Sequence, residues 1–205
     1  MEPTIAEHQF RVFAIRQPTD LIALITEVLG WQQPQTIVKL CSMVGDKVRT
    51  VIVEDYYVDK DFKSMLSFYY SKIFAPTDKA VKRLLFFESD IKGINELYTI
   101  DRDHQAGFLG FVTCYYNGTE QIGRSVLGFA KLGHKIKICS TTFDCNFLGS
   151  RLVVKGFPYI QQDTNVMACA QASIWMMMRY YSTKYNDYAE KYPSDIVQAD
   201  KDFSA

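Results

Sequence analysis

The sequence lacks an excess of charge of either sign, because its 23 lysine and arginine residues equal its 23 aspartate and glutamate residues. A neutral chain has no general attraction for the phosphates of nucleic acid or anionic lipid, so we expect neither as a partner. The sequence also lacks an apolar run near the ~18 residues that span a bilayer, and its first residues lack the basic and apolar regions of a secretory signal. These absences predict a cytoplasmic protein without a membrane span.

Cysteine is present, but not in the pattern of a disulfide scaffold or of a structural zinc site. The number is odd and no Cys-x-x-Cys pair occurs among the five, which are Cys41, Cys114, Cys139, Cys145 and Cys169. Reduced thiols in a cytosol are the simplest account of this usage. Structural zinc usually needs such pairs. We therefore expect neither a metal ion nor a cofactor.

Hydrophobic and helical patterns alternate in the first ninety residues. A hydrophobic share of 48%, with 14% aromatic residues, is enough for one large domain or two small ones. Periodicity, caps and turn residues predict six elements in this order: a strand over 9–16; a helix over 18–30, capped by Thr19 or Asp20 and ended by Gly30; two strands within 35–58 around a turn at Gly45 and Asp46; a helix within 59–76, with Phe62, Leu66, Tyr69 and Ile73 on one face and stopped by Pro76; and a buried strand over 81–88.

From residue 107 onward the pattern favours antiparallel strands. The expected strands are 107–116 and 120–129 around the hairpin turn Asn117-Gly118, one within 134–143 with Ile136, Ile138 and Ser140 on one face, and 151–157. The sequence thus predicts an α+β fold, in which a mixed α/β region precedes antiparallel β hairpins. We expect residues 1–155 to form an α+β accessory region, followed by a second unit at 156–205.

That second unit contains the stretch "GFPYIQQDTNVMACAQASIWMMMRYYS", residues 156–182, in which a polar loop changes into an apolar helix at Cys169. Asp163, Thr164 or Asn165 can cap this helix, which places Cys169 in or near its first turn. The free N–H groups and the dipole of a helix N-terminus favour thiolate over thiol. Free cysteine is also a common core residue. These arguments leave a nucleophile and a core residue as equal alternatives.

The same stretch resembles the cysteine segment of papain-like thiol peptidases, most closely the bacteriocin-processing, C39-like branch of bacteria. The resemblance rests on the Phe-Pro entry, the glutamines, the Cys-Ala-x-Ala sequence and the aromatic-rich helix, about 30 residues in all. It implies that Cys169 attacks a carbonyl carbon and that Gln162 contributes to the oxyanion hole. Gln162 precedes Cys169 by seven residues rather than the usual six, and the adjacent Gln161 is the other candidate.

A thiol nucleophile needs a base, normally histidine, which follows the cysteine in papain-like enzymes. None of the 36 residues after Cys169 is histidine, and His8, His104 and His134 all precede it. His104 lies beside Asp101 and Asp103, which allows a base with its orienting carboxylate, a pair of metal ligands, or a solvated loop. We therefore expect an incomplete papain-like domain, an inactive relative, or a base supplied from upstream.

Two functions follow from these observations. The first is thiol-dependent hydrolysis or acyl transfer on a peptide or protein substrate, with the isolated chain inactive for want of a base. The second is a non-catalytic binding or regulatory module in which Cys169 is a core residue. Because the helix after Cys169 is apolar on nearly every side, we expect self-association or a C-terminal partner segment to cover part of it.

Overall fold

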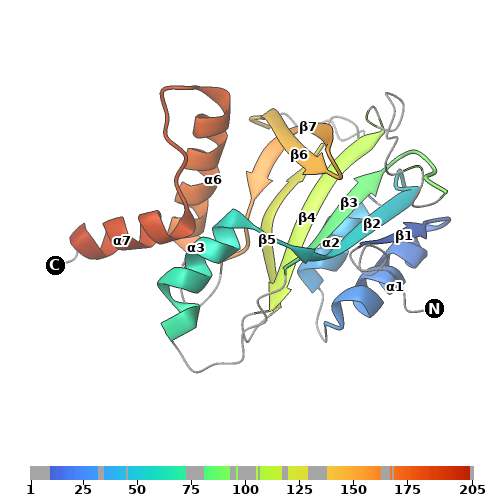
Figure 1. Cartoon of the computed structure of the whole chain (residues 1–205), viewed down its shortest axis with the longest axis horizontal. Coiled ribbons are helices and arrows are strands. Elements are labelled where there is room, and N and C mark those ends of the chain that lie inside the picture. Colours follow the sequence, from blue (N-terminus) through green and yellow to red (C-terminus); the bar gives the residue numbers. More distant parts are fainter. Residues whose placement is uncertain are drawn as a thin grey trace.

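The computed structural model represents the whole chain and describes residues 10–31, 35–44, 46–72, 81–92, 96, 105, 107–116, 120–128, 138–162, 167 and 169–203. A seven-stranded antiparallel sheet lies at the centre, in the order β1-β2-β3-β4-β5-β7-β6 (Figure 1). The sheet curls into a half-barrel, so that Phe10 and Phe147 of its two edge strands come into ring contact, with centroids 5.7 Å apart. The strands are β1 (Phe10–Ala14), β2 (Thr50–Tyr57), β3 (Val81–Phe87), β4 (Phe108–Tyr116), β5 (Glu120–Leu127), β6 (Thr141–Phe147) and β7 (Ser150–Tyr159).

Helices pack against this sheet in two groups (Figure 1). One group covers a face of the sheet near β1 and β2, and the other gathers beyond β5 and β7. The first group is α1 (Pro18–Leu29) and α2 (Gln35–Val44); the second is α3 (Lys60–Phe68) with the short 3-10 helix η2 (Tyr70–Lys72), α6 (Cys169–Lys184) and α7 (Pro193–Phe203). This arrangement confirms the predicted α+β class.

Helix α1 begins slightly before the predicted cap. Gln17 is the N-cap residue, while Asp20 accepts hydrogen bonds from the backbone N–H groups of Arg16 and Gln17 at 3.2 and 3.0 Å. Asp20 therefore closes the first turn as the third helical residue rather than as the cap. The predicted end is confirmed, because Gly30 adopts the left-handed conformation at φ 63°.

Residues 35–44 form a helix, and the strand predicted there is wrong. Ile37 and Val44 are both buried, and their spacing of seven residues places them on one helical face two turns apart. The short apolar run "TIVKL" satisfies a strand or a helix equally, and packing beside α1 selects the helix. The second strand of the predicted pair is confirmed as β2.

The strand predicted within 134–143 begins later than expected. Ile138 and Ser140 precede β6, which starts at Thr141, and Ile136 lies outside the described residues. The reason is strand pairing: β6 pairs with β7 only up to Gly156, after which β7 pairs with β5 instead. Residues before Thr141 therefore have no partner in that ladder. Ile73, Pro76 and the turn at Asn117 and Gly118 also lie outside the described residues.

Two glycines allow the central strands to approach closely. Gly110 of β4 has φ +133°, and a Cβ there would collide with the carbonyl oxygen of Val126. A Cβ on Gly156 of β7 would likewise collide with the carbonyl oxygen of Leu127. Only glycine fits such positions. Both glycines lie beside β5, which pairs with β4 on one side and with β7 on the other. After β7 the chain leads to the helix that begins at Cys169.

Three apolar clusters divide the interior. The first joins α1 and α2 to one face of the sheet, and the second fills the concave face beneath β6 and β7. The third joins α3, α6 and α7 and includes Phe62, Tyr115 and Trp175. Helix α6 thus lies on a cluster separate from the one beneath α1.

Candidate functional site

Helix α6 begins at Cys169, as the sequence predicts. Other side chains of the helix fix it in the interior, where Trp175 is fully buried and Arg179 is nearly so. Tyr180 packs on Phe157 of β7, with ring centroids 5.6 Å apart. The Ser173 hydroxyl donates to the Cys169 carbonyl oxygen at 2.9 Å and closes the first turn. The sulfur is therefore attached to a well-anchored helix.

The structure brings together the two residues that the resemblance selects. The Cys169 thiol donates a hydrogen bond to Oε1 of Gln162, and both side chains are exposed. Gln162 follows β7 directly, so the sheet positions the amide and α6 positions the sulfur. Residues 163–166 lie between these two residues in the sequence and are outside the described residues. They include the predicted caps Asp163, Thr164 and Asn165.

Gln161 and Gln162 have different partners. The Gln161 backbone N–H donates to the Ile122 carbonyl at 2.9 Å, and its side-chain Oε1 accepts from the Ile122 N–H at 3.2 Å. Gln161 thereby continues the hydrogen bonding between β5 and the residues that follow β7, whereas Gln162 points to Cys169. Of the two adjacent glutamines, the structure places the second at the sulfur.

The Gln162 amide has two chemically distinct ends. Oε1 accepts the thiol proton in this structure, and Nε2 on the same group has two N–H donors. A half-turn of the amide about its last torsion angle would direct Nε2 to the position that Oε1 now occupies. The residue is thus able to donate to an oxygen that gains negative charge beside the sulfur.

The other cysteines differ from Cys169 in exposure or in setting. Cys114 and Cys145 are buried, and burial raises the pKa of the Cys145 thiol to about 11. Cys139 is exposed, like Cys169, but it lies outside any helix. The side chain of Cys41 lies outside the described residues. Among the described thiols, Cys169 alone combines exposure with a position at a helix start.

The three histidines lie outside the described residues, as do Asp101 and Asp103. The possible base at His104 and the alternatives at His8 and His134 therefore stay predictions. Among the described residues no histidine faces Cys169.

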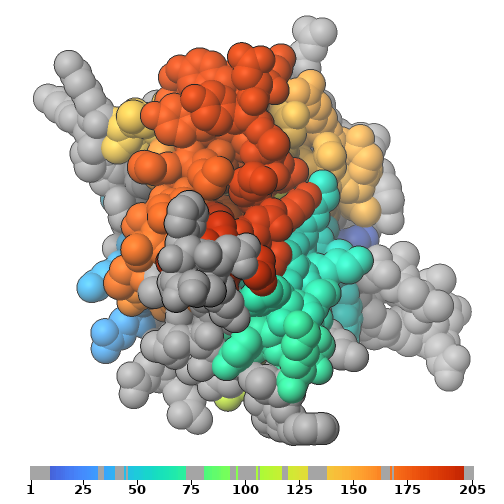
Figure 2. Space-filling view, turned by 90° about the vertical axis from the view of Figure 1, so that its left-hand side faces the viewer, coloured from blue at the N-terminus to red at the C-terminus, as the bar shows by residue number. Residues whose placement is uncertain are grey.

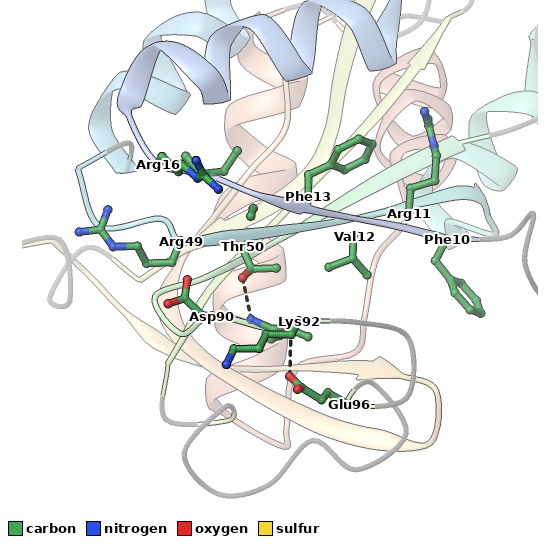
Figure 3. A pocket seen from close by; sticks show the side chains of 13 residues that line it. Phe10, Arg11, Val12, Phe13, Arg16, Arg49, Thr50, Asp90, Lys92 and Glu96 are labelled. Carbon is green, nitrogen blue, oxygen red and sulfur yellow. Dashed lines mark hydrogen bonds between the residues drawn. The ribbon is translucent and has the colours of Figure 1, made fainter.

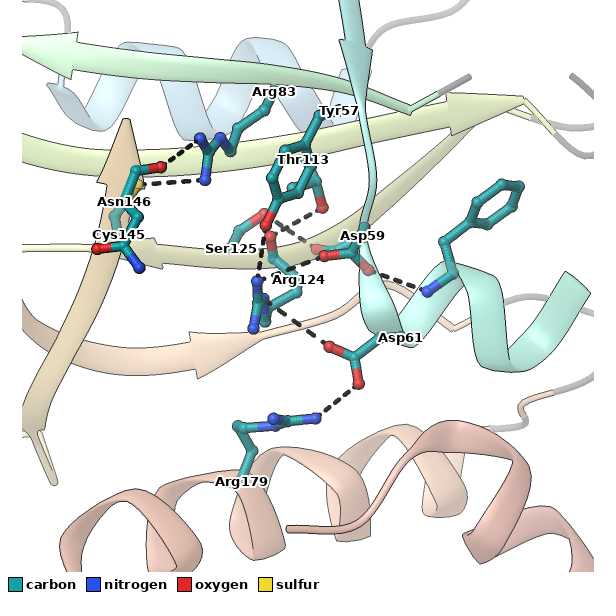
Figure 4. A network of polar contacts seen from close by, with 12 residues as sticks. Tyr57, Asp59, Asp61, Arg83, Thr113, Arg124, Ser125, Cys145, Asn146 and Arg179 are labelled. Atoms are coloured by element: carbon teal, nitrogen blue, oxygen red, sulfur yellow. Dashed lines mark hydrogen bonds and ion pairs between the residues drawn. The ribbon is translucent and has the colours of Figure 1, made fainter. Parts of the chain in front are cut away.

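Four charged side chains meet beneath α6 (Figure 4). Asp59 caps α3 by accepting from the Phe62 N–H at 2.9 Å, and Asp61 lies in the first turn of the same helix. Arg179 of α6 donates to Asp61 at 2.6 Å. Arg124 of β5 lies 3.6 Å from Asp59 and 3.8 Å from Asp61. One buried network thus joins α3, β5 and α6.

Further contacts extend this network toward α7. The Trp175 indole N–H donates to Asp61 at 3.2 Å. Arg179 pairs with Glu190 and donates to the Lys191 carbonyl oxygen at 3.3 Å. Arg179 therefore fixes both the tilt of α6 and the path of the segment that leads to α7.

Burial raises the pKa of Asp61 to about 6, and the nearby Asp59 charge adds to the rise while Arg179 and Arg124 oppose it. Burial likewise lowers the pKa of Arg179, whose largest opposing influence is Asp61. In both partners the cost of burying charge exceeds their mutual attraction. Each carboxylate side chain is only 1% exposed, so the network positions helices rather than contacting solvent.

The sequence analysis did not find this network. Asp59 and Asp61 flank a lysine at a helix start, where acidic residues are common for capping reasons alone. Arg124 follows Gly123 in β5, and Arg179 interrupts an apolar run. The one available signal was that interruption, because an arginine buried within an apolar segment needs a counter-charge.

A stripe of large apolar side chains lies on the outer side of α6. Ile174, Met177 and Tyr181 are 43%, 53% and 41% exposed, and Tyr185 and Tyr188 continue the stripe beyond the helix. Tyr181 stacks on both of these tyrosines, with centroids 6.0 and 5.5 Å apart. Figure 2 shows the face of the molecule formed by α3, α6 and α7.

A hollow of about 440 Å³ lies between α6 and α7. Its apolar walls come from Ala170, Ile174 and Met178 of α6 and from Ile196 and Ala199 of α7. Cys169 is directed toward β7, on a different side of α6, because it shares that side with Tyr180. The hollow is therefore not part of the thiol site.

Comparisons with protein-family models, with curated proteins and with solved structures gave no match. Within the described part of the chain, no group of three or more histidine, cysteine or acidic side chains could hold a metal ion. None of the described helices has the length and apolar character to cross a membrane.

Proposed function

We propose that this chain is a thiol-dependent acyl-transfer protein of the papain-like type, acting on a peptide or amide carbonyl. The observation that carries the proposal is the contact between Cys169 and Gln162. It joins an exposed thiol at the first residue of α6, a helix with one buried side, to an amide able to act as an oxyanion donor. The exposure of Cys169 argues against its alternative role as a core residue.

In this proposal the Cys169 sulfur attacks the carbonyl carbon, and the carbonyl π-electrons move onto oxygen. The Gln162 Nε2–H group donates to that oxyanion. Collapse expels the amine, which takes up the thiol proton, and leaves a thioester on Cys169. Water then hydrolyses the thioester and restores the thiol. A positioned base that moves these protons contributes about 10²–10⁴-fold, and this chain's candidates for that role are its three histidines.

An activated ester removes the need for a base and so tests the thiol and the amide alone. The purified chain is treated with p-nitrophenyl acetate at neutral pH, and acetylated cysteines are located by mass spectrometry. Cys139 is the internal control, because it is exposed without a glutamine partner or a helix start. We expect Cys169 to be acetylated at least tenfold faster than Cys139, and Gln162→Ala to abolish most of that difference. Equal rates at the two cysteines would contradict the proposal.

Peptide turnover is the companion measurement. We expect none from the purified 205-residue chain, as the sequence predicts. Turnover that disappears in Cys169→Ala would instead support an upstream base, and His104→Gln would then be the variant to compare.

We propose as a second candidate a non-catalytic module that self-associates through α6. Ile174, Met177 and Tyr181 follow the alternating three- and four-residue spacing of a helix–helix seam. A second copy of the same stripe would cover them symmetrically. Sedimentation of the wild type and of Met177→Glu tests this: a dimer that becomes monomeric in the variant supports the module, and a monomeric wild type contradicts it.

A further inference from the structure

The free edge of the sheet at β1 borders a hollow of about 1390 Å³ (Figure 3). Every residue from Phe10 to Arg16 lines it, together with Arg49, Thr50 and residues 90–92 on the other side. In sheet order β1 is as far as possible from β6 and its neighbour β7, which leads to Cys169. The residues that line the hollow include neither Gln162 nor any residue of α6, so the hollow and the thiol site share no residue.

The backbone of β1 offers hydrogen-bonding groups to this hollow. The Ile15 N–H donates to the Arg49 carbonyl oxygen at 2.7 Å, so the backbone N–H of residue 15 points toward β2. Residues alternate in direction along an antiparallel strand. The backbone N–H and C=O groups of Phe13 and Arg11 therefore also point toward β2, and those of Val12 and Ala14 point away from it. Among the described strands, none pairs with that outer side of β1.

The side chains around this edge carry a small excess of positive charge. Arg16 and Arg49 lie at the end of β1, and Lys92 lies across the hollow (Figure 3). Within the described part of the chain, none of these three forms a salt bridge. Arg11 also lines the hollow but is bound to Asp55 at 2.7 Å. The carboxylates in the lining are Asp90 and Glu96, so the three cations without a salt bridge exceed them by one.

Apolar side chains also line the hollow, beside the outward backbone groups and the cations. Val12 and Phe13 are half-buried, and Ile91 is buried with its N–H bound to the Thr50 hydroxyl at 3.0 Å. A strand placed beside β1 would meet backbone partners at Val12 and Ala14, apolar contacts at Val12 and Ile91, and cations at its end. Main-chain bonds then give affinity, and side-chain contacts give specificity.

We propose that β1 binds an extended acidic peptide segment, which adds to the sheet as an eighth strand. The peptide's backbone pairs with the outward N–H and C=O groups of Val12 and Ala14. Its carboxylates meet Arg16, Arg49 and Lys92, so this second binding site uses the edge strand β1 and not the residues around Cys169.

The test uses a blocked seven-residue peptide of alternating threonine and glutamate, with a fluorescent label, in low salt. Its control has lysine in place of every glutamate. Fluorescence anisotropy gives the affinity, and amide hydrogen exchange of the full chain locates the contact. We expect the acidic peptide to bind at least tenfold tighter than the lysine peptide and to protect the Val12 and Ala14 amides.

Val12→Pro removes one outward N–H without removing a bond to β2, since edge strands tolerate proline where the N–H faces outward. Val12→Thr keeps that N–H and is the matched control. We expect at least a tenfold loss of affinity in the first variant and little change in the second. An acidic peptide methylated at alternate backbone nitrogens tests the same bonds without altering the protein, and it should also lose at least tenfold.

Two results would overturn the proposal. One is an acidic peptide that does not bind. The other is binding that is unchanged by Val12→Pro and by N-methylation, which would show attraction by charge alone.

Discussion

The two helical groups of this molecule are attached to the same sheet by different interactions. Beneath α1 and α2 the contacts are apolar, from residues such as Leu21, Ile25 and Ile37, all essentially without exposure. Beneath α6 the apolar cluster around Trp175 is interrupted by the Asp61–Arg179 pair. An apolar surface tolerates small shifts of the helix upon it, whereas a charge pair with its hydrogen bonds fixes one arrangement. The helix that carries the exposed thiol is the one held by charge.

The largest expected effect on stability comes from breaking the charged attachment of α6. Arg179→Met keeps a long apolar side chain beside Trp175 but leaves Asp61 buried with only Arg124, 3.8 Å away, as a cation. Breaking a buried pair in this way costs about 3–5 kcal/mol of unfolding free energy. Urea unfolding at pH 7 measures it.

Arg151→Met is the matched control, because Arg151 pairs with Asp144 at 2.9 Å on the exposed surface. Exposed pairs contribute little, so we expect no clear change there. Similar losses in the two variants would remove the distinction between the buried and the exposed pair.

The next effect tests the apolar attachment. Leu21→Ala in α1 leaves a cavity at a fully buried position, which costs about 2–5 kcal/mol. Since no carboxyl or imidazole group lies in that cluster among the described residues, we expect the loss to be the same at pH 4 and pH 7. Urea unfolding at both pH values checks this, and a loss that changes with pH would mean that the two attachments are not independent.

The third effect is the pH dependence of the charged attachment. The pKa of Asp61 is about 6 in the folded chain, above its unfolded value of about 3.9. Folding then binds a proton between these two values, so the stability from protonated Asp61 is complete below pH 4 and is lost as the pH rises through 6. Over two pKa units this amounts to roughly 2–3 kcal/mol.

Asp61→Asn isolates this dependence, because the amide oxygen can still accept from Trp175 and Arg179. We expect the wild type to lose stability relative to the variant between pH 4 and pH 7, by the amount given above. Unfolding both proteins in urea at pH 4, 5.5 and 7 measures the difference. A constant difference across this range would show that Asp61 does not titrate there.

The same contrast explains what the sequence could predict. Elements with long periodic patterns were predicted within a few residues, including α1, β2 through β5, β7 and the start of α6 at Cys169. Residues 35–44 were predicted wrongly, because a short apolar run has no period of its own and neighbouring α1 decides its form. The resemblance to papain-like peptidases selected Gln162 as the partner of Cys169.

Sequence spacing could not find the charged network. Asp61 and Arg179 are separated by 118 residues, and only the three-dimensional arrangement of α3, β5 and α6 brings them together. Nor could it decide between the two glutamines, since that choice depends on where β7 leaves β5. Gln161 takes the last place in the β5 ladder through Ile122, and Gln162 is left to reach the sulfur.

The smallest expected effect concerns that division of roles between the two glutamines. Because Gln162 Oε1 accepts the Cys169 thiol proton and alkylation proceeds through the thiolate, removing the acceptor should speed alkylation. A hydrogen bond with a net contribution of about 0.5–1.5 kcal/mol predicts a two- to tenfold faster reaction with iodoacetamide at Cys169 in Gln162→Ala. The same variant slows acetylation by p-nitrophenyl acetate, in which an oxyanion forms.

Gln161→Ala is the matched control and should leave both rates at Cys169 unchanged, because its amide is bonded to Ile122. Opposite signs in the two assays would distinguish an amide that acts on the oxyanion from one that only shields the thiol, whereas a decrease in both would assign Gln162 to holding the thiolate.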